Sequence, residues 1–339
     1  MTAPELRRLG RSDLRVSPIC LGGNVFGWTV DEAMSHRLLD AWVDAGMNFV
    51  DTADVYSTWV HGHAGGESET IIGRWLKSSG KRDRVVVATK VGKPMPGGKG
   101  LSKRYILDAA DASLRRLQTD VIDLYQSHDD DASTPLEETL GAFAHLVKAG
   151  KVRAIGASNY GAQRLEAALR ISDELGLPRY ETLQPLYNLV ERRAYEHELE
   201  AVCVARGLGV LPFYALASGF LTGKYRSAAD LGKSPRASAA KKYLDPRGLG
   251  ILNALDAVAS TIGATPGQVA LAWLIARPGI TAPIASATTP AQLAELVGAA
   301  RLRLDTPSFD LIDKVSRAAD PSDEVSRPPE PGDRSLRPA

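Results

Sequence analysis

The sequence predicts an α/β protein built as a single (β/α)8 TIM barrel, with an N-terminal β-hairpin and long loops at the C-terminal face of the barrel. Three observations predict this fold. Short apolar runs alternate with amphipathic stretches, the runs start about thirty to thirty-six residues apart over most of the chain, and eight such units can be counted. A doubly wound sheet would show the same alternation. The number of units and the polar residues that follow the runs favour the barrel.

Length and composition restrict the class of protein. The 339 residues suffice for a sizeable buried core. We expect residues 1–320 to form one domain and residues 321–339 to form an irregular tail that is rich in proline. Because 41 Lys and Arg oppose 40 Asp and Glu, no strong net charge favours nucleic acid or anionic lipid. A small-molecule partner is therefore expected.

The cysteines and the N-terminal sequence indicate a cytoplasmic location. Cys20 and Cys203 are the two cysteines of the chain, too few for a disulfide scaffold. Residues 1–10 are charged and lack the apolar core of a signal peptide. No apolar run reaches the roughly 18 residues that predict a membrane span. We expect a cytoplasmic globular protein that binds neither a membrane nor nucleic acid.

The chain begins with a predicted hairpin over Glu5–Val16, with Gly10 and Asp13 in its turn, and we expect it to close the floor of the barrel. Eight predicted strands follow, several of them almost entirely Val, Ile and Leu, as expected for strands buried on both faces. They are Ile19–Leu21, Phe49–Asp51, Val85–Lys90, Val121–His128, Ala154–Ser158, Thr182–Tyr187, Val210–Phe213 and Thr281–Ile284.

Amphipathic segments between the strands predict helices. In Pro135–Ala149 the apolar residues recur at three- and four-residue spacing. Thr134 before Pro135, with acidic residues close behind, marks the start of this helix through a cap, a fixed φ and the helix dipole. The stretch Tyr214–Arg247 is rich in Gly, Ala, Ser, Lys and Arg and predicts a mobile loop over a ligand.

Polar side chains stand where three neighbouring predicted strands end. Asp51 ends the second strand, with Tyr56 five residues later, and Lys90 and His128 end the third and fourth. A barrel carries its chemistry at this end of its strands, so we expect the four side chains to converge. Each taken alone has an ordinary explanation, such as a turn or a solvated surface. Their joint occurrence at matching positions indicates a catalytic site.

The combination of these four residues suits carbonyl chemistry. A phenol with a pKa of about 10 is too weak an acid to protonate a carbonyl oxygen readily near neutral pH. A neighbouring Lys90 ammonium would lower the pKa of Tyr56, Asp51 would keep that lysine charged, and His128 would orient the carbonyl. We therefore expect Tyr56 to be the general acid for an oxyanion that forms as hydride arrives.

With these residues in place, the chain resembles the aldo-keto reductase superfamily from about Leu14 to Gly298. The segments FVDTADVY (49–56), ATK (88–90) and QSH (126–128) are similar to the family's Asp/Tyr, Lys and His motifs. GKVRAIGASN (150–159), QPLYN (184–188) and LTGKY (221–225) follow in the family's order. The resemblance implies that Tyr56 donates the proton, that Lys90 and Asp51 lower its pKa, and that His128 orients the carbonyl.

The resemblance also implies an NADP(H) cofactor and the residues that hold it. Ser158, Asn159 and Gln184 would hold the nicotinamide carboxamide, Phe213 would stack on the ring, and Gly23 and Asn24 would lie against the nicotinamide side. Further contacts implied for the pyrophosphate, the phosphates and the adenosine end are Leu216, Ser218, Lys224, Arg236, Ser286, Thr288, Gln292 and Glu295.

The cofactor motif departs from the family's pattern at its adenosine end. Many relatives carry Arg at the position of Thr288, where it binds the 2′-phosphate, and Asn is common at the position of Leu296. Loss of the Arg removes a charge-assisted bidentate contact. A preference for NADP would then depend on Lys224, Arg236 and hydroxyl groups, so use of NAD(H) is not excluded.

Other motifs predict no metal or phosphate site. His61 and His63 lack the third ligand that zinc requires. The loop Gly92–Gly100 lacks the spacing of a P-loop, and Asp129–Asp131 reads as a solvated acidic loop. No Gly-x-Gly-x-x-Gly opens a helix after a strand, which removes the usual Rossmann signal.

The substrate pocket and the activity leave alternatives. Pocket-wall candidates are Trp28, Trp59, His61, His63, Asp129, Asp130 and Tyr214. Such a set would suit a sugar-like or other polyhydroxylated carbonyl compound, and it would also tolerate a flat aromatic aldehyde. Against the enzyme stand an NADP-binding regulatory protein similar to potassium-channel β subunits and a non-catalytic metabolite-binding barrel. Those β subunits carry Asn at the position of His128, so the chain's own histidine favours the enzyme.

Overall fold

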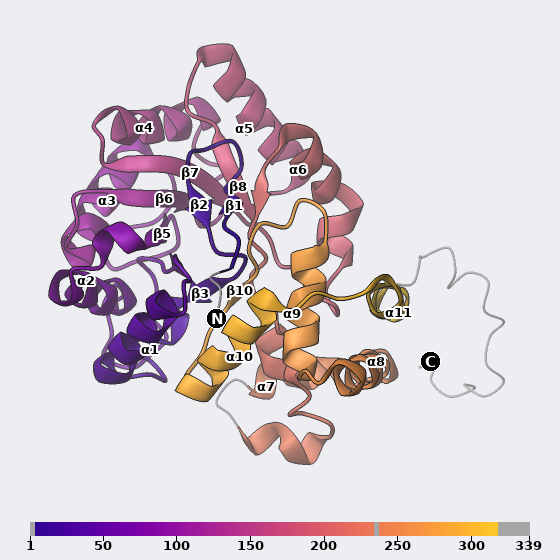
Figure 1. Cartoon of the computed structure of the whole chain (residues 1–339). Helices are drawn as coiled ribbons and strands as arrows, with labels where there is room; N and C mark the ends of the chain where they lie inside the picture. The colour runs from indigo at the N-terminus through magenta and orange to yellow at the C-terminus, as the bar shows by residue number, and fades with distance from the viewer. Residues whose placement is uncertain (1–3, 234–236, 318–339) are drawn as a thin grey trace, which may run out of the picture.

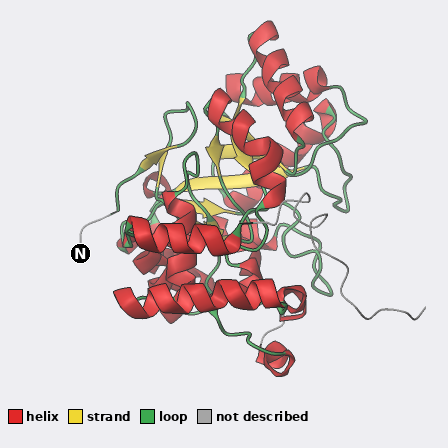
Figure 2. Cartoon of the chain, turned by 90° about the vertical axis from the view of Figure 1, so that its right-hand side faces the viewer, coloured by secondary structure: helices red, strands yellow, loops and turns green. Residues whose placement is uncertain are grey.

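The computed structural model describes residues 4–233 and 237–317, and it confirms the predicted barrel. Eight parallel strands are hydrogen-bonded in the order β10-β3-β4-β5-β6-β7-β8-β9. In Figure 1 the helices surround these strands, and Figure 2 shows the same arrangement from the side, with helices packed outside the sheet. The tail predicted for residues 321–339 lies outside the described residues.

The barrel strands are short and their bounds differ from the predicted ones. They are β3 Cys20–Gly22, β4 Phe49–Asp51, β5 Val86–Val91, β6 Ile122–Ser127, β7 Val152–Ser158, β8 Tyr180–Gln184, β9 Gly209–Val210 and β10 Ile284–Ala285. The last three predicted strands are each interrupted by a proline. Pro185, Pro212 and Pro283 have no N–H to donate to a neighbouring strand.

Irregular backbone closes the barrel between β9 and the segment before β10. Val210 pairs with Ile280 in an isolated parallel bridge. The amide of Ile284 donates to Pro212 O at 2.8 Å, and that of Cys20 donates to Pro283 O at 3.0 Å. The segment predicted as a strand over Thr281–Ile284 thus divides its hydrogen bonds between two neighbours, and Ile284 alone of its residues belongs to a regular ladder.

Two apolar clusters form the core, one inside the barrel and one between the strands and the helices. Phe49, Val86, Ala88 and Leu124 belong to the inner cluster. Because side chains alternate between the two faces of a strand, Asp51, Lys90 and Gln126 point inward as well, above those apolar residues. The barrel interior is therefore apolar below and polar at the carboxyl ends of its strands.

The predicted hairpin is present as β1 Arg7–Arg8 and β2 Arg15–Val16, which pair antiparallel. Leu9, Leu14 and Val16 of the hairpin belong to the cluster inside the barrel. The hairpin therefore covers the floor, as expected, and Figure 1 shows it lying over the strands.

The helices are α1 Glu32–Asp44, α2 Glu67–Ser79, α3 Lys103–Leu117, α4 Leu136–Lys148, α5 Ala162–Leu175, α6 Glu200–Arg206, α7 Ala237–Ala240, α8 Pro246–Ile262, α9 Pro266–Ala276, α10 Pro290–Arg301 and α11 Thr306–Ser316. The predicted start of α4 is wrong by one residue. Pro135 is the N-cap with an extended ψ of 139°, and it does not belong to the helix. The hydroxyl of Thr134 instead donates to Asp131 at 2.6 Å.

The stretch predicted as a loop over Tyr214–Arg247 consists largely of short helical turns. These are η4 Ala217–Thr222, η5 Ala228–Lys233, α7 and η6 Lys241–Tyr243. Ala237 and Ala240 are buried, so this segment packs against the barrel. Arg236 lies outside the described residues.

Helices α8 and α9 are apolar but neither could span a membrane alone. Within residues 4–233 and 237–317, no single helix is long and apolar enough for that role. The two helices meet the length and composition criteria only together, across a bend of 95°.

Candidate active site

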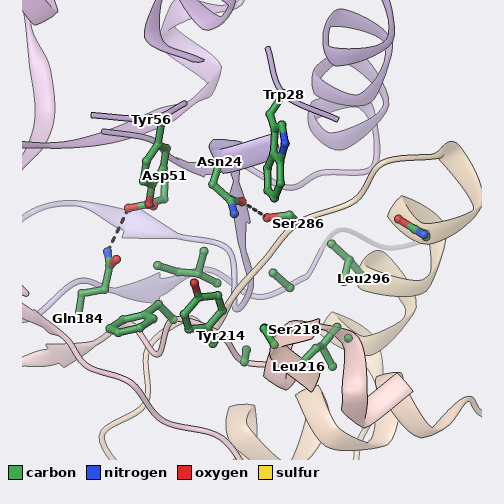
Figure 3. A pocket seen from close by; sticks show the side chains of 18 of the residues that line it. Asn24, Trp28, Asp51, Tyr56, Gln184, Tyr214, Leu216, Ser218, Ser286 and Leu296 are labelled. Carbon is green, nitrogen blue, oxygen red and sulfur yellow. Dashed lines mark hydrogen bonds between the residues drawn. The ribbon is translucent and has the colours of Figure 1, made fainter. Parts of the chain in front are cut away.

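A cavity of about 1200 Å³ opens at the carboxyl ends of the strands. Its wall extends from Asp51 and Tyr56 at one end to Glu295 and Leu296 of α10 at the other. Figure 3 shows the two ends, with Asn24 and Ser286 between them. The cavity is therefore elongated along the barrel rim, as a dinucleotide site would be.

Lys90 connects the predicted catalytic residues at one end of this cavity. Its ammonium donates to Asp51 Oδ2 at 2.6 Å, to Thr52 O at 2.7 Å and to the Tyr56 hydroxyl at 3.0 Å. Lys90 is fully buried and Asp51 almost so. The pairing of β4 with β5 and of β5 with β6 brings these strand ends together. The structure thus places Tyr56 directly against a buried cation.

Burial has the largest effect on the pKa of Tyr56 and raises it to about 12. The ammonium of Lys90 lowers this pKa, and Asp51 raises it. Our expectation of a net decrease is therefore wrong for the protein described here, although the effect of Lys90 has the expected sign. Burial also opposes the charge on Lys90, but Asp51 and Tyr56 outweigh it and raise the pKa of the ammonium.

His128 lies beside Tyr56, with ring centroids 6.0 Å apart. Burial lowers the pKa of His128 well below its usual range, and the charges of Lys90 and Lys93 lower it further. The imidazole is therefore neutral at physiological pH and can donate one N–H. Its Nδ1 is buried and has no hydrogen-bond partner among the described residues.

A hydrogen-bonded layer lies next to Asp51 at the ends of β6, β7 and β8. Gln184 Nε2 donates to Asp51 Oδ1 at 3.0 Å, as Figure 3 shows. Ser158 donates to Gln184 O at 2.9 Å, and Asn159 donates to His128 O at 2.9 Å. Asn159 has a φ of 56°, in the left-handed region that asparagine tolerates. These three residues line the cavity, so they remain available to a ligand there.

Gly22, and not Gly23, forms the cavity wall beside Asn24. A Cβ on Gly22 would lie 2.7 Å from Ser286 Oγ, whereas one on Gly23 would face Ser68 and the backbone of Asp51. The sequence prediction thus selected the neighbouring glycine. Ser286 donates to Asn24 Oδ1 at 2.6 Å and joins the start of the barrel to its end (Figure 3).

The segment after β9 carries Phe213, Tyr214, Leu216 and Ser218 along the cavity. Tyr214, Ala217 and Ser218 have φ values of 52°, 48° and 57°. Non-glycine residues rarely adopt this region, and they do so mostly where the surroundings hold the backbone for a function. Asn188 contributes here by donating to Tyr214 O at 3.0 Å.

The far end of the cavity lies at the start of α10. Gln292 and Glu295 line it, as expected, and Ser286 and Lys224 line the cavity between its two ends. Thr288 does not line the cavity, because its amide and hydroxyl both donate to Gln292 Oε1, at 2.8 and 3.0 Å. Sequence reasoning missed Thr265 and Pro266 on this wall. A threonine followed by a proline is a typical capped start of a helix, and this pair was the available signal.

Only part of the predicted substrate pocket is on the wall. Trp28, Trp59, Tyr214 and Asp129 line the cavity. The three other candidates do not: His61 is exposed next to a turn at Gly62, His63 contacts Ser57 Oγ at 3.1 Å, and Asp130 accepts from Arg164 at 2.9 Å. Lys93, which the sequence analysis missed, lines the cavity and pairs with Asp129.

A second buried polar group lies close in sequence to Tyr56. Asp54 is 2% exposed, and its Oδ1 has no hydrogen-bond partner among the described residues. Burial and the nearby charge of Glu69 raise the pKa of Asp54 to about 7. Glu69 itself is held by Thr89 at 2.6 Å and by Arg116 at 2.7 Å. Asp54 therefore changes its protonation near neutral pH without contacting the cavity.

Side chains of the types that bind metals do not gather at one place in the described part of the chain. Among residues 4–233 and 237–317, no group of three or more His, Cys, Asp or Glu side chains could hold a metal ion. Cys20 and Cys203 are both buried free thiols.

Comparisons with known proteins agree with this geometry. The model of the aldo/keto reductase family matches residues 18–317. The uncharacterized oxidoreductase YrpG of Bacillus subtilis is 37% identical over 322 residues, which cover 92% of this chain and 95% of that protein. A probable voltage-gated potassium channel subunit beta of Arabidopsis thaliana is 34% identical, covering 86% and 89%. Protein tas of Escherichia coli is 32% identical, covering 92% and 97%.

Proposed function

Since the chain belongs to the aldo/keto reductase family, we propose that it is an NADP(H)-dependent oxidoreductase that reduces aldehydes or ketones to alcohols. Sugar-like and other polyhydroxylated carbonyl compounds are its proposed substrates. In the overall reaction the carbonyl, NADPH and one proton give the alcohol and NADP⁺.

The observation that carries this proposal is the 3.0 Å hydrogen bond from Lys90 to the Tyr56 hydroxyl, beside a neutral His128. A carbonyl oxygen held by the Tyr56 hydroxyl and the His128 imidazole would develop negative charge during reduction. Tyr56 would then donate its proton to that oxygen, and the Lys90 ammonium would stabilise the phenolate that remains. Asp51 would keep Lys90 charged and in place.

The cavity suits a nicotinamide dinucleotide. When bound, this cofactor would supply the hydride. Asn24, Ser158, Asn159 and Gln184 offer amide and hydroxyl groups at the catalytic end, and Phe213 offers an aromatic face there. Leu216, Ser218, Lys224 and Ser286 lie along the middle, and Gln292 and Glu295 lie toward the far end.

The preference between NADP and NAD depends on the far end. Besides Lys93 near the Tyr56 end, Lys224 is the cation that lines the cavity among the residues described, and Thr288 is turned toward Gln292. We propose NADP(H) as the main cofactor. Some use of NAD(H) is proposed as well, because Thr288 stands where many relatives carry the arginine that binds the 2′-phosphate.

Fluorescence titration with NADPH and, separately, NADH tests the cofactor. Quenching of the tryptophan signal at lower concentrations of NADPH than of NADH would support the proposal. Equal affinity would show relaxed discrimination, and the absence of binding to either would refute the redox function. NADPH oxidation with a panel of aldehydes and ketones then tests the reaction.

A regulatory NADP-binding protein is the second candidate. The resemblance to a probable potassium channel subunit beta favours it. Tight NADPH binding with no carbonyl turnover by the wild-type protein would support this candidate over the enzyme.

A further inference from the structure

We propose that the ion pair of Lys93 and Asp129 is the subsite that selects the substrate, by binding a hydroxyl group on a carbon atom next to the reacting carbonyl. The inference rests on the carbonyl reduction proposed above and names its substrate class as α-hydroxylated aldehydes and ketones.

Strand register places this pair beside the catalytic groups. Lys90 is opposite Gln126 and Val91 is opposite Ser127 in the β5–β6 ladder. The amide of His128 continues the ladder by donating to Val91 O at 2.8 Å. Two residues beyond the ends of β5 and β6, Lys93 pairs with Asp129. The pair therefore stands one residue beyond His128, where the substituents of a carbonyl held by His128 and Tyr56 would lie.

The chemistry of the pair matches a hydroxyl group. Lys93 and Asp129 both line the cavity, with side chains 34% and 40% exposed, so a ligand can reach them. The ammonium has three N–H groups and donates to one oxygen of Asp129, and no other hydrogen bond of either side chain occurs within the described residues. The pair can thus donate and accept at one place, as a hydroxyl does.

The same pair disfavours other substituents. A carboxylate would accept a hydrogen bond from Lys93 but would be repelled by Asp129. Because the charges of the pair sum to zero, the pair offers no net attraction to an anion. An alkyl group would displace water from both charged side chains, and it could not replace the hydrogen bonds that the water makes to them. The pair therefore distinguishes hydroxylated carbonyls from both acidic and plain aliphatic ones.

Aromatic side chains supply a complementary surface in the same cavity. Trp28 and Trp59 meet edge to face at 5.6 Å, and Trp59 lies 5.9 Å from Tyr56 between ring centroids. Their faces can pack against the C–H groups of a polyhydroxylated chain, while its hydroxyl groups bond the ion pair. This combination favours an amphipathic substrate.

The test compares two aldehydes with the same three-carbon chain. 2-Hydroxypropanal carries the one α-hydroxyl group that propanal lacks, so the ratio of their kcat/KM values, corrected for hydration, isolates recognition of that hydroxyl. We expect the wild-type ratio to exceed ~10, because a hydrogen bond to a charged group contributes about that factor or more. Lys93→Met and Asp129→Asn should each lower the ratio about tenfold. The ratio also cancels any general effect of the Lys93 charge on His128.

Two controls match these variants. Lys99→Met makes the same substitution in the same loop at an exposed position outside the cavity wall. Asp130→Asn makes the same change at the neighbouring aspartate, which pairs with Arg164. Both should keep the wild-type ratio. Because a partly exposed ion pair contributes little to stability, the Lys93 and Asp129 variants should fold normally.

Three outcomes would overturn the proposal. An unchanged ratio in Lys93→Met and Asp129→Asn, with propanal still reduced, would refute the subsite and leave the reductase intact. A preference for succinic semialdehyde over butanal that Lys93→Met abolishes would mean that the lysine binds carboxylates. No NADPH oxidation with any aldehyde would overturn the carbonyl reduction itself, and the subsite with it.

Discussion

Replacement of Lys90 by Met should separate the stability role of the buried ion pair from its proposed catalytic role. Lys90 loses three hydrogen bonds in this variant, to Asp51, Thr52 and Tyr56. Removing one partner of a buried pair costs about 3–5 kcal/mol. Asp51 keeps the amide of Gln184 at 3.0 Å and that of Gln126 at 3.4 Å. We therefore expect the lower end, about 3 kcal/mol, which a domain of ordinary stability tolerates.

A second substitution, Asp51→Asn, removes the charge that Lys90→Met leaves unpaired. The double variant should recover about 2 kcal/mol relative to Lys90→Met, because the asparagine oxygen can still accept from Gln184 while no carboxylate remains buried. Activity should not recover, since the proposed stabilisation of the Tyr56 phenolate is absent in both variants. The kcat/KM of each variant for carbonyl reduction should be at least about 100-fold below that of the wild type.

Urea unfolding followed by circular dichroism, together with NADPH oxidation, measures both effects. The reasoning is refuted if the double variant is no more stable than Lys90→Met, because the unpaired charge would then not be the source of the loss. It is equally refuted if Lys90→Met retains most of the wild-type turnover.

Three further predictions concern Tyr56, His128 and Asp54. Tyr56→Phe should lose at least about 99% of carbonyl reduction yet keep NADPH quenching, and retained turnover would exclude Tyr56 as the acid. The reductive kcat/KM should stay level from about pH 7 to about pH 10, because His128 is already neutral and the pKa of Tyr56 is about 12; a decline centred near pH 8 would contradict this. The free energy of unfolding of the wild type should decrease as the pH rises from about 4 to about 7. The pKa of Asp54 is raised to about 7 in the folded protein, so this carboxyl loses its proton at lower pH in the unfolded chain. Asp54→Asn should remove that decrease, which amounts to about 3 kcal/mol between pH 5 and pH 8, as urea unfolding at these two pH values would show; an equal loss of stability in the variant and the wild type would refute it.

The sequence predicted the fold and the convergence of Asp51, Tyr56, Lys90 and His128 well, because both depend on local patterns. Apolar runs at regular spacing fix the number of barrel units, and alternation along β5 fixes that Lys90 points inward with Ala88. The ends of β8, β9 and the last strand were less accurate, because an apolar run does not show where Pro185 or Pro283 breaks a ladder.

Features that depend on contacts between distant segments could not be predicted in the same way. The choice between Gly22 and Gly23 depends on the position of Ser286, more than 260 residues away in the chain. The pKa of Tyr56 depends on how completely the site excludes water, which no spacing reveals. The Lys93–Asp129 pair follows from the β5–β6 register, so only an exact alignment of the two strands could have suggested it.

Because β10 pairs with β3, the cavity wall combines segments that are synthesised at very different times. Gly22 and Asn24 leave the ribosome more than 260 residues before Ser286, which donates to Asn24 Oδ1 in the folded protein. Until β10 has been synthesised, the edge of β3 that pairs with it has no neighbour. A chain that ends shortly before residue 280 would lack β10 and the six cavity-wall residues that lie between Ile284 and Leu296. The complete cavity can therefore form only after β10 and α10 have left the ribosome.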